Sequence, residues 1–492
     1  MSQKNLKQKA VSGMIWTALQ KYSTMLIQFI SGIILARLLT PYDYGCIGML
    51  MIFMVLAESF IDGGFGSALI QKKRPTQEDY STIFWWNLSM AVVLYVVLYF
   101  SAPAIARFYD IPLLCDVLRV QGIVLFIYAF NIIQRNQLRK KLNFKILSII
   151  TITTSVIALT MTIIMAYHGY GVWALVAQHL LTAFIPALVF WFYIKWRPIL
   201  VFSVKSFKEL FSFGFYIFLN NFFVNFSRQI QGLLIGKFYN PAIMGYYSKA
   251  HSTEKLASHS ISQVLTQVTF PLYSEVQDDK RRMINILEQL IGIIAYMTFP
   301  LIAVLILIAK PLFILLYSDR WLDSVPYFQI LCLAGLGICL QSINLQTISA
   351  VGKSRTVFVW SVIKQTIGII LAVGGLLFFG INGLLWGAAI HSWSCLLINM
   401  YLVSRHIGYN LKSQLWSLFP VTAVTLVAFL ASYLVGKELN LGLYISGGIK
   451  FIIFAIIYLG WTILFKPKPF CELRTLAFSK LKKKHGIIST EK

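Results

Sequence analysis

Basic and amide side chains recur at helical spacing inside apolar segments of this sequence, where they could bind an anion. Lys21 and Gln28 share one face of the first long apolar segment, and Asn221, Asn225 and Arg228 share one face of a later one. Polar residues at membrane depth are costly and tend to face a cavity. We therefore expect both faces to line a cavity, and a structural or interfacial lysine is the alternative for Lys21.

Among the predicted apolar segments, residues 243–271 carry the most polar side chains. They include Lys249, Lys255 and His259 among several serine and glutamine residues. Exposure of such a face to lipid would be hard to tolerate, so we expect it to line a water-filled cavity, the alternative being a buried polar seam between helices. Lys364 is a further candidate for binding the same ligand.

Two acidic residues, Glu58 and Asp62, lie one helical turn apart in the second apolar segment, and Asp62 opens a glycine-rich stretch. They could form a proton or cation site that couples transport to an ion gradient. The alternative is a structural role, with Asp62 capping the irregular end of its helix or pairing with Lys21.

Together the expected cavity residues carry more positive than negative charge, which suits an anionic ligand such as a phosphate. An exporter of organic cations would need the reverse, carboxylates with aromatic rings. The six cysteines form no CxxC pair, the histidines lack metal-site spacing and no P-loop motif is present. We predict no catalytic residues, no metal, no cofactor and no enzymatic activity.

The elements that position these residues are predicted from composition. The 492 residues are 58% hydrophobic and only 12% charged, whereas soluble domains carry about 25% charged residues. Recurring apolar runs predict an all-α polytopic membrane protein. We expect about fourteen transmembrane helices, near residues 11–38, 44–66, 81–104, 115–134, 146–167, 171–194, 207–236, 243–271, 286–309, 325–349, 356–379, 382–403, 414–435 and 441–464.

An internal repeat organises these spans. Residues 12–45 recur as 212–245, so that Pro41 and Gly45 match Pro241 and Gly245. Repeats of this kind are typical of transporters with two lobes. We predict two pseudo-symmetric six-helix lobes, two extra C-terminal spans and a basic cytoplasmic tail, with boundaries at 1–205, 206–410, 411–464 and 465–492.

Lysine and arginine are concentrated in alternate connections, which places both termini in the cytoplasm. The opposite connections hold only Arg37, Arg107, Lys237, Lys310, Arg320 and Lys437. The net charge of +25 therefore reflects the inner face of a membrane protein and predicts no nucleic-acid partner. The densest inner patch, residues 135–145, is expected to contact anionic membrane lipid.

Several stretches across the predicted lobes are similar to the Wzx-type polysaccharide flippases, and the chain most resembles the WzxC-like branch of the multidrug/oligosaccharidyl-lipid/polysaccharide exporter superfamily. These stretches are LARLLTPYDYG (35–45), IDGGFGSALIQKK (61–73), STIFWWN (81–87), IIQRNQLRKKLNFK (132–145), GYGVWALV (169–176) and LLYSDRW (315–321).

The resemblance implies a bacterial inner-membrane protein whose spans 1, 2, 7 and 8 line a central cavity. It implies flipping of an undecaprenyl-pyrophosphate-linked oligosaccharide by alternating access, with polysaccharide polymerase and export machinery as candidate partners. A cation-coupled multidrug antiporter of the same superfamily is the alternative. A membrane glycosyltransferase is disfavoured because the sequence has no large outer loop, and a scaffold would not need polar faces at depth.

Overall fold

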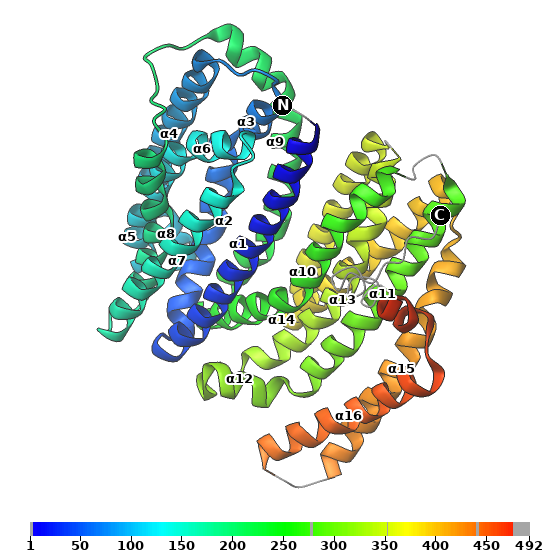
Figure 1. Ribbon diagram of the computed structural model, residues 1–492. Helices are drawn as coiled ribbons and strands as arrows, with labels where there is room; N and C mark the ends of the chain where they lie inside the picture. The colour runs from blue at the N-terminus through cyan, green and yellow to red at the C-terminus, as the bar shows by residue number, and fades with distance from the viewer. Residues whose placement is uncertain (1–2, 276–278, 352, 439–441, 476–492) are drawn as a thin grey trace. The chain divides into compact units, whose positions relative to one another are not determined.

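In the computed structural model every described element is a helix (Figure 1). The structure describes residues 3–275, 279–351, 353–438 and 442–475, with the side chains of 3–11, 259–272, 274–275 and 354–355 left aside. The chain divides into two compact units, Met1–Ser248 and Lys249–Lys492, which are described separately.

Unit 1, residues 1–248, is built from α1 to α9 and the first two turns of α10. Within it α1 packs along α7, α7 lies beside α8 (Figure 1), and α9 packs against α2, α3 and α4. The helices are α1 (Gln3–Leu38), α2 (Pro41–Asp62), α3 (Phe65–Gln71), α4 (Gln77–Tyr109), α5 (Leu113–Gln121), α6 (Val124–Lys140), α7 (Phe144–Tyr167), α8 (Val172–Tyr193), α9 (Val204–Phe238) and α10 (Pro241–Glu275).

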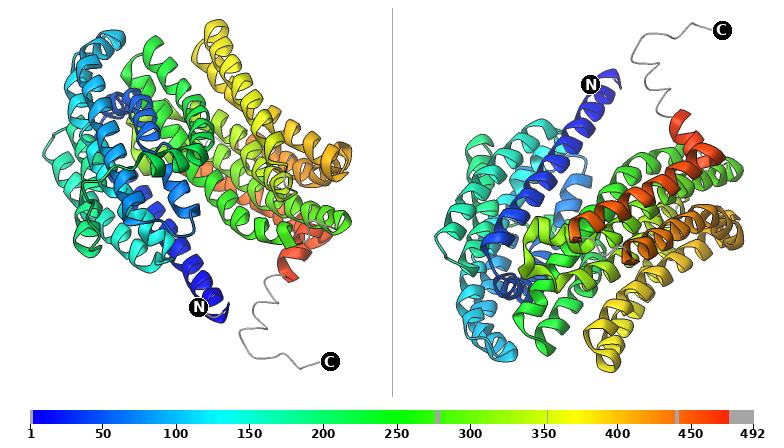
Figure 2. Two further views of the ribbon diagram at one scale, coloured as in Figure 1. Left: turned by 90° about the horizontal axis from the view of Figure 1, so that it is seen from above. Right: turned by 90° about the horizontal axis from the view of Figure 1, so that it is seen from below.

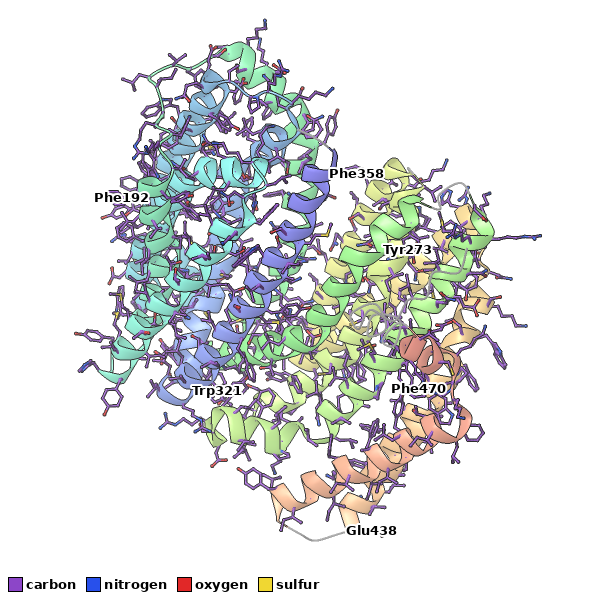
Figure 3. The ribbon with its side chains drawn as sticks, viewed as in Figure 1. Phe192, Tyr273, Trp321, Phe358, Glu438 and Phe470 are labelled. Carbon is purple, nitrogen blue, oxygen red and sulfur yellow. The ribbon has the colours of Figure 1, made fainter. Side chains whose placement is uncertain are left out.

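Unit 2, residues 249–492, contains the rest of α10 and the later helices. In it α13 packs on α14, α11 packs on α13 and α15, and α15 runs beside α16, as Figure 2 shows. Trp321, labelled in Figure 3, is fully buried. The helices are α11 (Lys280–Leu307), α12 (Ala309–Tyr317), the 3-10 turn η1 (Asp319–Trp321), α13 (Ser324–Ala350), α14 (Ser354–Ile407), α15 (Leu411–Glu438) and α16 (Leu443–Phe465).

Two helices of unit 1 begin at reciprocal caps. At the start of α4, Thr76 accepts a hydrogen bond from the Asp79 backbone N–H at 3.1 Å, and the Asp79 carboxylate accepts one from the Thr76 N–H at 2.8 Å. Thr40 and Asp43 form the same capping box at the start of α2, where Pro41 is the first helical residue. Each box satisfies backbone donors at the start of its helix that would otherwise be unpaired.

The long α14 is a helical hairpin, because Gly380 interrupts it with φ 64° and ψ −151°. This backbone conformation favours glycine. On either side of the turn the two arms approach closely, and a Cβ atom added at Gly383 would lie 2.1 Å from the Gly375 carbonyl oxygen. The two arms correspond to the predicted spans 356–379 and 382–403.

Eleven described helices, some of them continuous pairs such as α2 with α3, are long and apolar enough to cross a membrane. The hairpin α14 counts once among them, and α1 and α10 are not included, since polar residues recur along both helices. The all-α polytopic fold is thus confirmed. The number of fourteen spans and the lobe boundaries at 205, 410 and 464 stay predictions, and residues 476–492 of the predicted tail lie outside the described residues.

The predicted repeat is confirmed at its central turn. The helices α1 and α9 end at Leu38 and Phe238, and the next helices begin at Pro41 and Pro241, so both boundaries are offset by 200 residues. In the second copy the Asn240 side chain accepts a hydrogen bond from the Ile243 N–H at 3.0 Å. Asparagine and threonine thus cap equivalent helices, which explains why the turn is preserved although the cap residue differs.

Candidate functional site

The glycine-rich stretch after Asp62 separates α2 from α3. Gly63 and Gly64 both have positive φ, 51° and 76°, and a Cβ atom at Gly64 would lie 2.1 Å from the Gly214 carbonyl oxygen of α9. The Asp62 carboxylate lies beside this break, since a Cβ atom added at Gly66 would lie 2.9 Å from the Asp62 Oδ1. Both the capping role and the coupling role of Asp62 stay predictions.

Two lysines hold α3 in position. The Lys140 ammonium at the end of α6 donates to the carbonyl oxygens of Leu69 and Ile70 at 3.0 Å, and also to that of Lys72. The Lys72 ammonium lies 3.0 Å from carboxylate oxygens of both Asp79 and Glu209. Burial works against the charge of Lys72, but its hydrogen bonds to Glu209 and Asp79 outweigh burial and raise its pKa.

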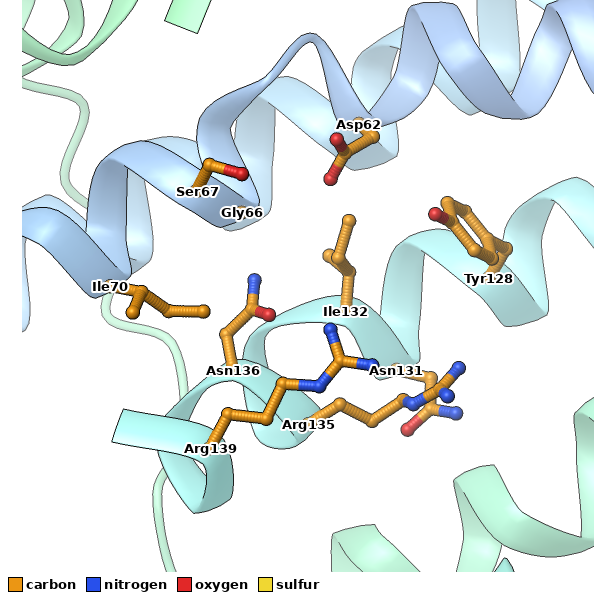
Figure 4. A pocket seen from close by; sticks show the side chains of 10 residues that line it. All are labelled: Asp62, Gly66, Ser67, Ile70, Tyr128, Asn131, Ile132, Arg135, Asn136 and Arg139. Carbon is orange, nitrogen blue, oxygen red and sulfur yellow. The ribbon is translucent and has the colours of Figure 1, made fainter. Parts of the chain in front are cut away.

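A polar cavity of about 360 Å³ lies between the α2–α3 break and α6 (Figure 4). Neither the Arg135 nor the Arg139 guanidinium forms a hydrogen bond or ion pair with another described side chain, although both line the cavity. Its lining residues are Asp62, Gly66, Ser67, Ile70, Tyr128, Asn131, Ile132, Arg135, Asn136 and Arg139.

Buried amides add to the hydrogen-bonding capacity of this cavity. Asn131 and Asn136 are only 7% and 4% exposed, and the Asn131 Oδ1 and Asn136 Nδ2 atoms have no partner among the described residues. An unpaired buried polar atom costs about 1–3 kcal/mol. A polar ligand in the cavity could supply the missing hydrogen-bond partners of these atoms.

Most residues of this cavity were not predicted from the sequence as ligand contacts. Residues 135–145 were expected only to contact lipid, whereas Arg135 and Arg139 line the cavity together with Asn131. The signal was present, because residues 131, 135 and 139 are each four apart and so share one face of α6. What the sequence did not reveal is that this face lines the same cavity as Asp62.

The predicted residues of unit 1 lie on three helices. On α1, Lys21 is half-buried and Gln28 is exposed; on α9, both Asn221 and Arg228 are exposed. The Asn225 amide donates to the Ser59 hydroxyl at 3.0 Å, which joins α9 to α2 one residue from the half-buried Glu58. Their roles in ligand binding or ion coupling stay predictions.

Among the predicted residues of unit 2, the side chain of Lys249 is 4% exposed. Its ammonium lies 4.4 Å from the ring centre of Tyr317 and 5.3 Å from that of Trp321, a cation–π arrangement that stabilises the buried charge. Lys255 is exposed on α10. The side chain of His259 lies outside the described residues, and ligand binding by all three stays a prediction.

Lys364 is also buried, 7% exposed, and its ammonium donates to the Asn399 Oδ1 at 2.8 Å across the two arms of α14. The Asn399 Nδ2 in turn donates to the Gln341 carbonyl oxygen of α13 at 3.4 Å. This chain of hydrogen bonds gives Lys364 a structural role in holding the hairpin against α13. Its predicted role in ligand binding remains a prediction.

Substitutions of this pair should separate the two roles. We expect Asn399→Leu to lower the melting temperature more than Lys364→Met, because it leaves a buried ammonium without its acceptor, at a cost of about 3–5 kcal/mol. The double variant should be more stable than Asn399→Leu alone. Thermal unfolding of the purified variants tests this order, and a double variant less stable than either single one would contradict it.

Comparison with known proteins places these features in a family. A model of the family described as polysaccharide biosynthesis protein matches residues 34–326. The teichuronic acid biosynthesis protein TuaB of Bacillus subtilis (strain 168) is 26% identical over 92% of this chain and 96% of its own length. The lipopolysaccharide biosynthesis protein WzxC of Escherichia coli (strain K12) is 19% identical over 89% of each chain.

A solved structure has the same fold. The lipid II flippase MurJ, in an inward closed conformation, superimposes with a TM-score of 0.77 at 15% identity, over 92% of this chain and 98% of MurJ. At this identity the similarity establishes the fold alone. The matched family model covers more than half of the chain. The chain therefore belongs to the polysaccharide biosynthesis protein family.

Proposed function

We propose that this protein moves an undecaprenyl-pyrophosphate-linked oligosaccharide from the inner to the outer leaflet of the bacterial inner membrane. Membership of the polysaccharide biosynthesis family supports a lipid-linked glycan as cargo. The names of TuaB and WzxC refer to teichuronic acid and lipopolysaccharide, both surface polysaccharides, so we place the transported unit in surface polysaccharide synthesis.

The observation that carries the pyrophosphate assignment is the presence of exposed cations on helices that run through predicted spans. Arg228 on α9 and Lys255 on α10 are both exposed, although a cation at membrane depth is costly unless it meets water or an anion. Arginine and lysine bind phosphate oxygens through charge-assisted hydrogen bonds. We therefore propose that each side chain, in its own unit, binds phosphate oxygens of the cargo.

The direction of transport follows from charge and topology. With both termini in the cytoplasm, the cargo binds from the inner leaflet while its lipid tail stays in the bilayer. An inside-negative potential favours outward movement of an anion by about 2.3 kcal/mol per charge per 100 mV. Alternating access, in which the binding site opens first to one side and then to the other, completes the cycle.

Binding of purified protein to undecaprenyl pyrophosphate tests the proposal. We expect tighter binding than to undecaprenyl phosphate, weakening at higher salt because charge pairs are screened, and about tenfold weaker binding for Lys255→Ala, the loss of one charge-assisted contact. Lys280→Ala, at an exposed lysine where α11 begins, is the matched control. Binding of a cationic dye that protons or sodium displace, with no preference for pyrophosphate, would instead favour the multidrug antiporter.

A further inference from the structure

The cavity between the α2–α3 break and α6 contains neither of the cations assigned above to the pyrophosphate. Its hydrogen-bond donors suit a phosphate. Arg135 and Arg139 lie one turn apart on α6, and both guanidinium groups line the cavity. The buried Asn136 Nδ2 adds a donor without an acceptor. Planar guanidinium groups match the oxygens of a phosphate better than a single point charge does.

The hydrogen-bond acceptors of the same cavity argue against inorganic phosphate as its best ligand. The Asp62 carboxylate lines the wall opposite α6 (Figure 4) and would repel a free anion. The buried Asn131 Oδ1 also lacks a donor. The Asn131 Oδ1 and the Asp62 carboxylate can both accept hydrogen bonds from hydroxyl groups. The two carboxylate oxygens of Asp62 together offer about four acceptor positions.

We propose that this cavity binds a glycosyl phosphate, with Arg135 and Arg139 on the phosphate and Asp62 and Asn131 on sugar hydroxyls. A volume of about 360 Å³ lies within the range of about 300–1,000 Å³ typical of small-molecule sites. The predicted topology places residues 135–145 at the cytoplasmic face, so the ligand enters from the cytoplasm.

The inference rests on the proposed function for the source of its ligand. The first sugar and adjoining phosphate of the lipid-linked cargo have this chemistry, and so do soluble sugar phosphates and nucleotide sugars. In the first case the cavity is the place where the cargo head group binds before it moves across the membrane. In the second it senses the supply of precursor.

Calorimetric titration of the full-length protein in phosphatidylcholine nanodiscs tests the cavity without any transport. The probes are glucose 1-phosphate, inorganic phosphate and glucose. We expect glucose 1-phosphate to bind at least about tenfold more tightly than inorganic phosphate or glucose, because each hydrogen bond to a charged group contributes about a tenfold factor in affinity. Equal affinity for glucose 1-phosphate and inorganic phosphate would overturn the proposal.

Variants locate the binding. Arg135→Gln should weaken glucose 1-phosphate about tenfold or more, whereas Arg74→Gln, at an exposed arginine that does not line the cavity, should bind as wild type. Asn131→Asp keeps the size of the side chain and adds a negative charge, so it should abolish binding while the melting temperature stays near wild type. Equal loss in Arg74→Gln and Arg135→Gln would overturn the assignment, as would normal binding by Asn131→Asp.

Competition identifies the source of the ligand. Displacement of glucose 1-phosphate by polyprenyl-diphosphate N-acetylglucosamine in the nanodisc supports the lipid-linked cargo, and displacement by UDP-glucose alone supports a soluble ligand. Displacement by phosphatidylglycerol would show an anionic-lipid site and overturn the proposal. Binding of glucose 1-phosphate by a protein that shows no preference for undecaprenyl pyrophosphate would support this cavity and refute the proposed transport, so the two failures give different results.

Discussion

Cells that depend on this protein for surface polysaccharide should lose it when Arg228 or Lys255 is replaced by glutamate. Each reversal replaces attraction for the pyrophosphate by repulsion, and a charge pair at 4 Å contributes about 4 kcal/mol at an effective dielectric constant of about 20. We therefore expect a loss of at least about 100-fold in polysaccharide export. Surface polysaccharide would be measured in a complemented deletion strain, with membrane protein levels determined by immunoblot.

Matched variants distinguish a binding defect from a general loss of charge. Lys205→Glu reverses an exposed cation in the first turn of α9, the helix that carries Arg228, and should export normally. Arg228→Lys keeps the charge but loses the planar donors, so an intermediate defect is expected. Export at wild-type levels by either Arg228→Glu or Lys255→Glu, with normal amounts of protein, would disprove the assignment of that residue.

Local and periodic features of this fold could be predicted from the sequence, because each depends on residues close together in the chain. The matching turns before Pro41 and Pro241, which the repeat predicted, are of this kind. The helical hairpin of α14 was likewise predicted as two spans, since polar and glycine residues separate two apolar runs. Long apolar runs determine a helix whatever they pack against.

The candidate site was less predictable because it depends on contacts between distant segments. Asp62 was recognised as an acid beside glycines, and residues 135–145 as a basic patch, but their meeting across one cavity requires the packing of α3 on α6. Lys364 shows the same limit. The sequence places a lysine in an apolar segment, but it does not reveal that the ammonium donates to Asn399, 35 positions away on the returning arm of the hairpin.

The repeat of residues 12–45 at 212–245 has a physical consequence in unit 1. A Cβ atom added at Gly45 would lie 1.7 Å from the Pro241 carbonyl oxygen, and one added at Gly245 would lie 1.9 Å from the Pro41 carbonyl oxygen. The first turn of α2 thus lies against the glycine of α10, and the first turn of α10 lies against the glycine of α2. The two glycines are equivalent in the repeat and also in their contacts.

Alanine at Gly45 or Gly245 should therefore force the beginnings of α2 and α10 apart, at a cost of about 1–3 kcal/mol from overpacking. We expect each variant to lower the melting temperature of the detergent-solubilised protein by several degrees, which scanning fluorimetry would measure. Because one movement of the helices relieves both clashes, the double variant should lose less stability than the sum of the single losses.

Gly460→Ala in α16, where no atom lies within 4 Å of the added Cβ, is the matched control and should be neutral or stabilising. A Gly45→Ala variant as stable as Gly460→Ala would show that the close crossing of α2 and α10 does not contribute to the folded state.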